Sequence, residues 1–192
     1  MNGNLLSTLW PQSQAIHKAA MVALGVVILT LASKLQVPFW PVPMTLQTLA
    51  VLMIAATAGA RLGTATVLAW LALGAVGAPV FATGAGLAYM AGPTGGYLAG
   101  FLVAAAVVGK LADSGYGRTL PSALVMLLAG EVVIYGLGVG WLAVLLLSNQ
   151  RELMQLLGPL GLHWLGVAET PLPLIGVLLA LAGALLSAFA YV

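Results

Sequence analysis

The chain has 192 residues, of which 62% are hydrophobic and only 5% are charged, against about 25% charged residues in a typical soluble domain. This composition excludes a water-soluble globular protein. The absence of cysteine excludes disulfides and thiolate metal sites, and a formal net charge of +2 gives no basis for nucleic-acid binding.

Six stretches are apolar enough to cross a bilayer, for which a helix needs roughly 20 residues. None has the apolar/polar alternation of an outer-membrane strand, so helices are predicted. Backbone groups left unsatisfied in lipid cost several kcal/mol each, which also favours a helical bundle. The prediction is therefore one all-α integral membrane domain over residues 1–192, a bundle of six transmembrane helices. The spans are Ala19–Gln36, Met44–Ala60, Leu62–Ala78, Gly95–Leu111, Leu120–Leu147 and Leu172–Val192.

The positions of the cations predict the orientation, because Lys and Arg in short loops collect on the cytoplasmic side. Four of the six cations fall on one side of the predicted bundle, namely Lys18, Arg61, Lys110 and Arg118. That side is predicted to be cytoplasmic, as are both termini. The three outer connections are then Val37–Pro43, Pro79–Thr94 and Ser148–Pro171.

Sequence signatures of catalysis are missing. A phosphate-binding loop needs Ser or Thr after its Gly-Lys pair, whereas Gly109-Lys110 is followed by Leu111. No serine lies in a G-x-S-x-G context. His17 and His163 are predicted near opposite membrane faces, where interfacial residues are a better interpretation than metal ligands. The chain is not expected to be an enzyme or to hold a metal or cofactor, and any ATP-driven step must come from another protein.

The first outer connection, Gln36–Met44, packs three prolines and two aromatic residues into nine positions. Proline fixes the backbone, so a stiff apolar segment that could act as a lid is predicted. Trp40 in this segment is either a wall of a ligand pocket or an ordinary interfacial anchor. Gln47, expected one turn into the second helix, suits a ligand amide or an interhelical hydrogen bond.

The segment Gly92–Tyr97 opens the fourth predicted helix at the outer face. Helix N-termini carry partial positive charge and free N–H groups, which favour an anion. Gly95 and Gly96 lack β-carbons and would allow close approach to the backbone, and Thr94 adds a hydroxyl. A ligand site and a tight turn with a helix cap both fit this pattern.

Glu131 lies well inside the fifth predicted span. An acidic side chain at that depth costs about 2.5–3.5 kcal/mol on insertion scales, so it should face a partner or a cavity. We favour a functional role over a protonated, structurally satisfied carboxyl.

Three segments together resemble the BioY family, the biotin-specific substrate-binding (S) components of energy-coupling factor (ECF) transporters. They are Lys34–Ala50 (KLQVPFWPVPMTLQTLA), Gly77–Phe81 (GAPVF) and Leu87–Phe101 (LAYMAGPTGGYLAGF). The resemblance runs from about residue 17 to residue 147. Unrelated hydrophobic segments would not reproduce PVPMTLQT and GPTGGY in this order.

The resemblance implies a six-helix protein of the bacterial cytoplasmic membrane that binds biotin from outside and mediates its uptake. It also implies assembly with a transmembrane coupling subunit and two ATPase subunits. An alanine-rich face of the first helix makes that contact in the family, matched here by Ala19 and Ala23. The expected ligand-binding residues are Trp40, Gln47, Phe81, Tyr89, Thr94, Gly95, Gly96, Tyr97 and Glu131.

Two positions depart from the family pattern. Helix six usually opens with a P-G-D-x-x-K-like segment, whereas this chain reads ETPLPLIG over Glu169–Gly176. Glu131 stands where an asparagine is common. The alternative is therefore an S component for another small vitamin-like ligand. A structural subunit or passive channel is a further class, but a channel needs a continuous polar stripe and the spans offer mainly Glu131 and a few threonines.

Overall fold

The computed structural model describes residues 12–38 and 42–157. Within these residues, four helical segments are long and apolar enough to cross a membrane: Ala15–Lys34, Gln47–Ala75, Gly95–Asp113 and Leu120–Ser148. The predicted all-α, multi-span architecture is confirmed at this level, and the predicted sixth span, Leu172–Val192, lies outside the described residues. The elements are α2 (Gln12–Lys34), β1 (Gln36–Val37), β2 (Met44–Thr45), α3 (Gln47–Ala75), α4 (Gly86–Met90), α5 (Gly95–Asp113) and α6 (Leu120–Leu157).

The helix α3 contains the second and third predicted spans and is broken between them at Gly59, whose φ of 75° and ψ of 178° are not helical. A β-carbon added at Gly63 would lie 2.9 Å from the Cα atom of Ala55. Eight residues along a straight helix would separate these positions by about 12 Å, so the two halves fold back on each other. Asp113 at the end of α5 secures this turn, because its carboxylate accepts a hydrogen bond from the backbone N–H of Ala60 at 3.1 Å.

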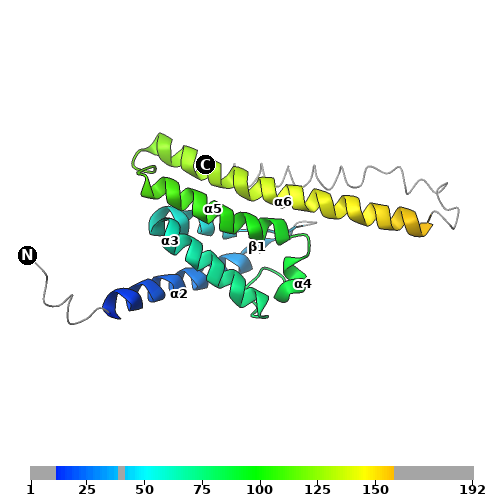
Figure 1. Cartoon of the computed structure of the whole chain (residues 1–192), viewed down its shortest axis with the longest axis horizontal. Helices are drawn as coiled ribbons and strands as arrows, with labels where there is room; N and C mark the ends of the chain where they lie inside the picture. The colour runs from blue at the N-terminus through cyan, green and yellow to red at the C-terminus, as the bar shows by residue number, and fades with distance from the viewer. Residues whose placement is uncertain (1–11, 39–41, 158–192) are drawn as a thin grey trace, which may run out of the picture.

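The helices pack in the order α2, α3, α5, α6, with α3 between α2 and α5 and α5 between α3 and α6 (Figure 1). Small residues allow the close approaches that membrane helices need. A β-carbon at Gly100 would lie 3.0 Å from the Ile134 Cα atom of α6, and one at Gly109 would overlap the backbone of Ala60. Large apolar side chains elsewhere, such as Leu24 and Val132, are exposed, as expected for a surface that faces lipid.

The observed boundaries differ from the predicted ones for the first helix and for the start of the second helix. The first helix begins at Gln12 and ends at Lys34, because helix formation does not require the apolar residues on which the prediction was based. Residues Gln36–Val37 and Met44–Thr45 then form a short antiparallel pair, with Gln36 opposite Thr45. Gln47 is consequently the first residue of α3 rather than one turn inside it.

The fifth predicted span also proved too short. It was expected to end at Leu147, with Ser148–Pro171 as an outer loop, whereas α6 continues to Leu157. The sequence between these points is polar but free of proline and rich in good helix formers, so it continues the helix without being apolar. The C-terminal part of α6 extends past α4 and the start of α5 (Figure 1).

Candidate functional site

The candidate site lies at the end of the bundle where α2 ends and where α3 and α5 begin. The connection that follows α3 is attached there to the last turn of α2 by two side-chain hydrogen bonds. The Ser33 hydroxyl donates to the Val80 carbonyl oxygen at 2.8 Å, and the Lys34 ammonium donates to the Phe81 carbonyl oxygen at 2.6 Å. These bonds fix the backbone that carries Phe81.

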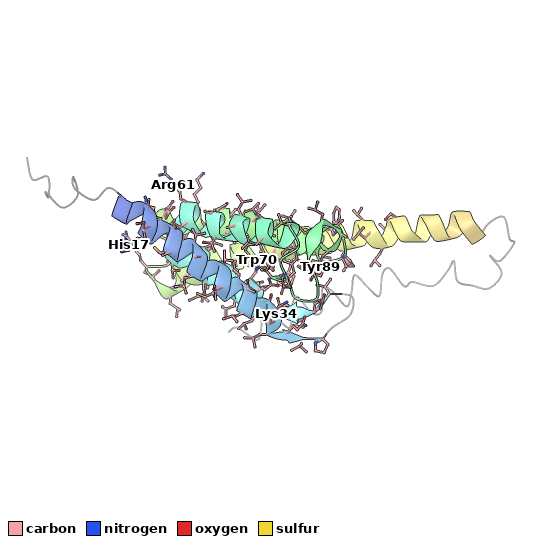
Figure 2. The ribbon with its side chains drawn as sticks, turned by 90° about the horizontal axis from the view of Figure 1, so that it is seen from below. His17, Lys34, Arg61, Trp70 and Tyr89 are labelled. Carbon is pink, nitrogen blue, oxygen red and sulfur yellow. The ribbon has the colours of Figure 1, made fainter. Side chains whose placement is uncertain are left out.

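Three aromatic rings form a wall at this end. Phe81, which is 1% exposed, stacks on Tyr89 with ring centroids 5.1 Å apart and meets Trp70 edge to face at 4.9 Å. A β-carbon at Gly74 would overlap the Phe81 ring, so this glycine provides the space for it. The structure therefore brings together Phe81 and Tyr89, both predicted site residues, and adds Trp70 from the second half of α3. Figure 2 labels Trp70 and Tyr89 near one another.

Gln47 is buried beside the short strands, with 5% of its surface exposed. Its Oε1 atom accepts a hydrogen bond from the Thr45 hydroxyl at 3.2 Å, and Thr45 Oγ1 in turn accepts from the Gln47 backbone N–H at 3.3 Å. Both bonds are local rather than interhelical. Within the described part of the chain the Nε2 donor of Gln47 has no partner.

The segment before α5 combines a turn with an unused hydroxyl. The Gly95 N–H donates to the Gly92 carbonyl at 3.0 Å, and Thr94 occupies the N-cap position without making a side-chain cap bond. Its Oγ1 atom is buried and has no hydrogen-bond partner among the described residues. The turn that the sequence suggested is present, and the Thr94 side chain makes no cap hydrogen bond.

The two glycines after Thr94 allow close approach of neighbouring elements, α4 at Gly95 and α6 at Gly96. A β-carbon at Gly95 would overlap the Met90 carbonyl oxygen, and one at Gly96 would overlap Trp141. Trp141 also donates its indole N–H to the Gly92 carbonyl oxygen at 2.9 Å. The space left by the missing side chains is thus filled by protein, and ligand contact at these glycines stays a prediction.

Tyr97 of α5 contacts α6, and Glu131 lies on α6 itself. The Tyr97 ring meets Tyr135 edge to face at 6.0 Å and lies against Gly138, where a β-carbon would overlap it. Glu131 is half-buried on α6, and within the described residues its Oε2 atom is buried without a hydrogen-bond partner. This oxygen can accept a hydrogen bond from a donor that the described residues do not provide.

Four buried polar atoms without hydrogen-bond partners in the described residues indicate which groups a ligand would have to offer. Burying a polar group without a hydrogen bond costs about 1–3 kcal/mol, so such atoms need an explanation. Two are N–H donors, one is a hydroxyl and one is a carboxylate oxygen; in the described residues they are Gln47 Nε2, Trp70 Nε1, Thr94 Oγ1 and Glu131 Oε2. Together with the aromatic wall they suit a small ligand that both donates and accepts hydrogen bonds and has an apolar ring.

The remaining predicted positions fall elsewhere. Trp40 lies outside the described residues. Ala19 and Ala23 are exposed on α2, where they border a shallow groove between α2 and the second half of α3. Within residues 12–38 and 42–157 there is no group of three or more His, Cys, Asp or Glu side chains that could hold a metal ion.

Comparison with known proteins supports the resemblance found in the motifs. Residues 7–191 match the BioY family. The "Biotin transporter BioY2" of Lactococcus lactis subsp. cremoris MG1363 is 36% identical over 132 residues, which cover 68% of this chain and 72% of that protein. The "Biotin transporter BioY" of Rhizobium etli CFN 42 is 39% identical over 137 residues, 67% of this chain and 71% of that one.

A solved structure has a similar fold. It is described as the S-component for biotin from an ECF-type ABC transporter, and it superposes with a TM-score of 0.63 at 26% identity, covering 91% of this chain and 93% of that one. These related proteins are transporters or transporter components. The expectation that this chain is not an enzyme is confirmed. The chain belongs to the BioY family.

Proposed function

We propose that this chain is the substrate-binding S component of an ECF-type transporter and captures biotin for uptake across the cytoplasmic membrane. The observations that carry the proposal are the four unpaired polar atoms and the contact of the Phe81 ring with Trp70 and Tyr89. The names of the related transporters supply the ligand to be tested.

The chemistry of biotin matches what the site offers. Its urea has one carbonyl acceptor and two N–H donors, its fused bicyclic ring is apolar, and its carboxylate is anionic. Unpaired donors on Gln47 and Trp70 fit the urea oxygen, and the Glu131 carboxylate oxygen fits a urea N–H. The rings of Phe81 and Tyr89 fit the apolar bicycle, because aromatic walls bury a large area at small entropic cost.

The proposed orientation places the site on the outer face of a six-helix domain with cytoplasmic termini. Arg61 and His17 lie at one end of the bundle, while Lys34, Tyr89 and the aromatic wall lie toward the other (Figure 2). The bias of short-loop cations supports a cytoplasmic position for the Arg61 end. Reagents that cannot cross membranes should label a cysteine introduced at Val42 in intact cells and spare one at Arg118, and the reverse pattern would overturn this sidedness.

The proposed partners are a transmembrane coupling subunit and two ATPase subunits, which would supply the energy for release inside. The exposed Ala19 and Ala23 face of α2 is the surface on which we place the coupling subunit, since small residues permit close helix contact. Replacing both alanines by leucine should abolish copurification with the coupling subunit while biotin affinity stays unchanged. Retained assembly would remove this face from the interface.

Isothermal titration calorimetry of the detergent-purified protein with biotin tests the function directly. We expect saturable binding, and undetectable binding at micromolar biotin would reject the proposal. Native mass spectrometry of the same sample tests the alternative ligand, because an S component for another vitamin would carry that molecule through purification. The helix-six segment that motivates this alternative, Glu169–Gly176, lies outside the described residues.

A further inference from the structure

Trp70 is the largest fully buried side chain in the described part of the protein and the least expected member of the site. It is 0% exposed, and its indole N–H has no hydrogen-bond partner among the described residues. A buried tryptophan N–H normally donates to an acceptor, because a buried donor without a hydrogen bond costs about 1–3 kcal/mol. Trp141, in contrast, donates its indole N–H to the Gly92 carbonyl oxygen.

The fold of α3 places Trp70 level with a second unpaired donor. Counted from the break at Gly59, Gln47 lies about 18 Å back along the first half and Trp70 about 17 Å along the second. The two halves run back along each other, and Val51 and Val67, equally far from the break, belong to the same buried cluster. Two buried N–H donors, one from each half of α3, therefore lie at the same depth in the bundle.

The side chain that covers Trp70 is carried by a connection rather than by a helix. The Phe81 ring contacts Trp70 edge to face, and the Phe81 and Val80 carbonyls are held on α2 by side-chain hydrogen bonds from Lys34 and Ser33. A ligand that shifts the Phe81 side chain locally, and keeps contact with its ring, would reach the indole without disturbing the packing of the long helices.

We propose that Trp70 determines ligand specificity by donating its indole N–H to the urea oxygen of biotin, beside the Nε2 donor of Gln47. This inference rests on the proposed function. A carbonyl oxygen has two lone pairs and can accept both bonds at once. The purpose of two matched donors is discrimination, because a site built to donate rejects an analogue that offers no acceptor.

The test compares biotin with 2-iminobiotin, whose urea is replaced by a guanidinium that is cationic at neutral pH and has no acceptor. Calorimetry gives the affinity ratio of the two compounds for the wild type, for Trp70→Phe and for Trp141→Phe. Loss of one donor should lower the ratio about tenfold in Trp70→Phe, the size of one good hydrogen bond. Trp141→Phe is the matched control, since its N–H is already used by Gly92, and its ratio should equal that of the wild type.

The possible outcomes separate the inference from the function on which it rests. An unchanged ratio in Trp70→Phe, with biotin still bound, overturns the role of Trp70 and leaves biotin capture standing. Absence of biotin binding by the wild type overturns both. If Trp70→Phe does not fold, the indole N–H resonances of the wild type decide instead, assigned by replacing the other tryptophans singly. The Trp70 resonance should move downfield when biotin is added and should not move with 2-iminobiotin. A Trp70 resonance that does not shift with biotin refutes the proposal.

Discussion

Replacing Gly59 by alanine is the most direct test of the fold that positions the site. The residue has a φ of 75° and a ψ of 178°, a conformation essentially restricted to glycine that costs a side chain about 1–3 kcal/mol. An added β-carbon would also overlap the Asp113 carboxylate and break its bond to the Ala60 N–H, worth about 1 kcal/mol. The free energy of unfolding should therefore fall by about 2–4 kcal/mol, which for a chain of this size lowers Tm by about 5–15 °C.

Two further variants isolate these contributions. Gly77 also has a positive φ, of 99°, but a β-carbon there would meet nothing within 4 Å, so Gly77→Ala should cost only the strain and lower Tm by about 3–6 °C. The double variant Gly59→Ala with Asp113→Ala removes the overlap, and it should be no less stable than Gly59→Ala alone. Thermal scans of intrinsic fluorescence in detergent measure all of these Tm values on the same scale.

The reasoning is refuted if Gly59→Ala and Gly77→Ala lower Tm equally, because Asp113 would then not lie against Gly59. If the Gly59→Ala variant were as stable as the wild type, the break in α3 at Gly59 would also be contradicted. Gln47 and Trp70 would no longer be expected at one depth.

Three other substitutions have definite expected results. Lys34→Met removes the ammonium that holds the Phe81 carbonyl and should weaken biotin binding about tenfold in calorimetry; Lys110→Met at the opposite end should have no effect, and equal effects would contradict the assignment. Glu131→Gln should also lower biotin affinity about tenfold if its unpaired oxygen accepts from the ligand, and unchanged affinity would remove it from the site. Gly96→Ala places a β-carbon against α6, so overpacking of about 1–3 kcal/mol should lower Tm by about 3–10 °C in detergent, and an unaltered Tm would mean that the helices are not in contact there.

Hydropathy predicted the helical spans well because lipid imposes a simple length rule on apolar stretches. It separated the second and third spans at Arg61, close to the observed break at Gly59, since a charge interrupts an apolar run. It could not predict the pairing of Gln36 with Thr45, because strands of two residues have no periodicity to recognise. It also ended the fifth span at Leu147, where apolarity stops but the helix does not.

The site was harder to predict than the fold for a different reason. Motif residues such as Phe81 and Tyr89 were found through the family resemblance, and the structure brings their rings into contact. Trp70 carries no such signal, because a tryptophan within an apolar span is usually a packing residue. What distinguishes it is an N–H without a partner, and that property depends on neighbours from α3, the following connection and α4 rather than on its own sequence.

The unpaired polar atoms are significant because of the solvent around the bundle. In a soluble protein, an unpaired donor near the surface is usually satisfied by water at little cost. In the hydrocarbon region that supply is absent, so a polar atom without a partner must be paired by the protein or by a bound molecule. The bundle obtains its close helix contacts from glycines at Gly63, Gly96, Gly100 and Gly109, and within the described residues the four unpaired atoms take part in none of the hydrogen bonds between its elements. Buried donors and acceptors without a protein partner are thus the atoms that a bound ligand would satisfy.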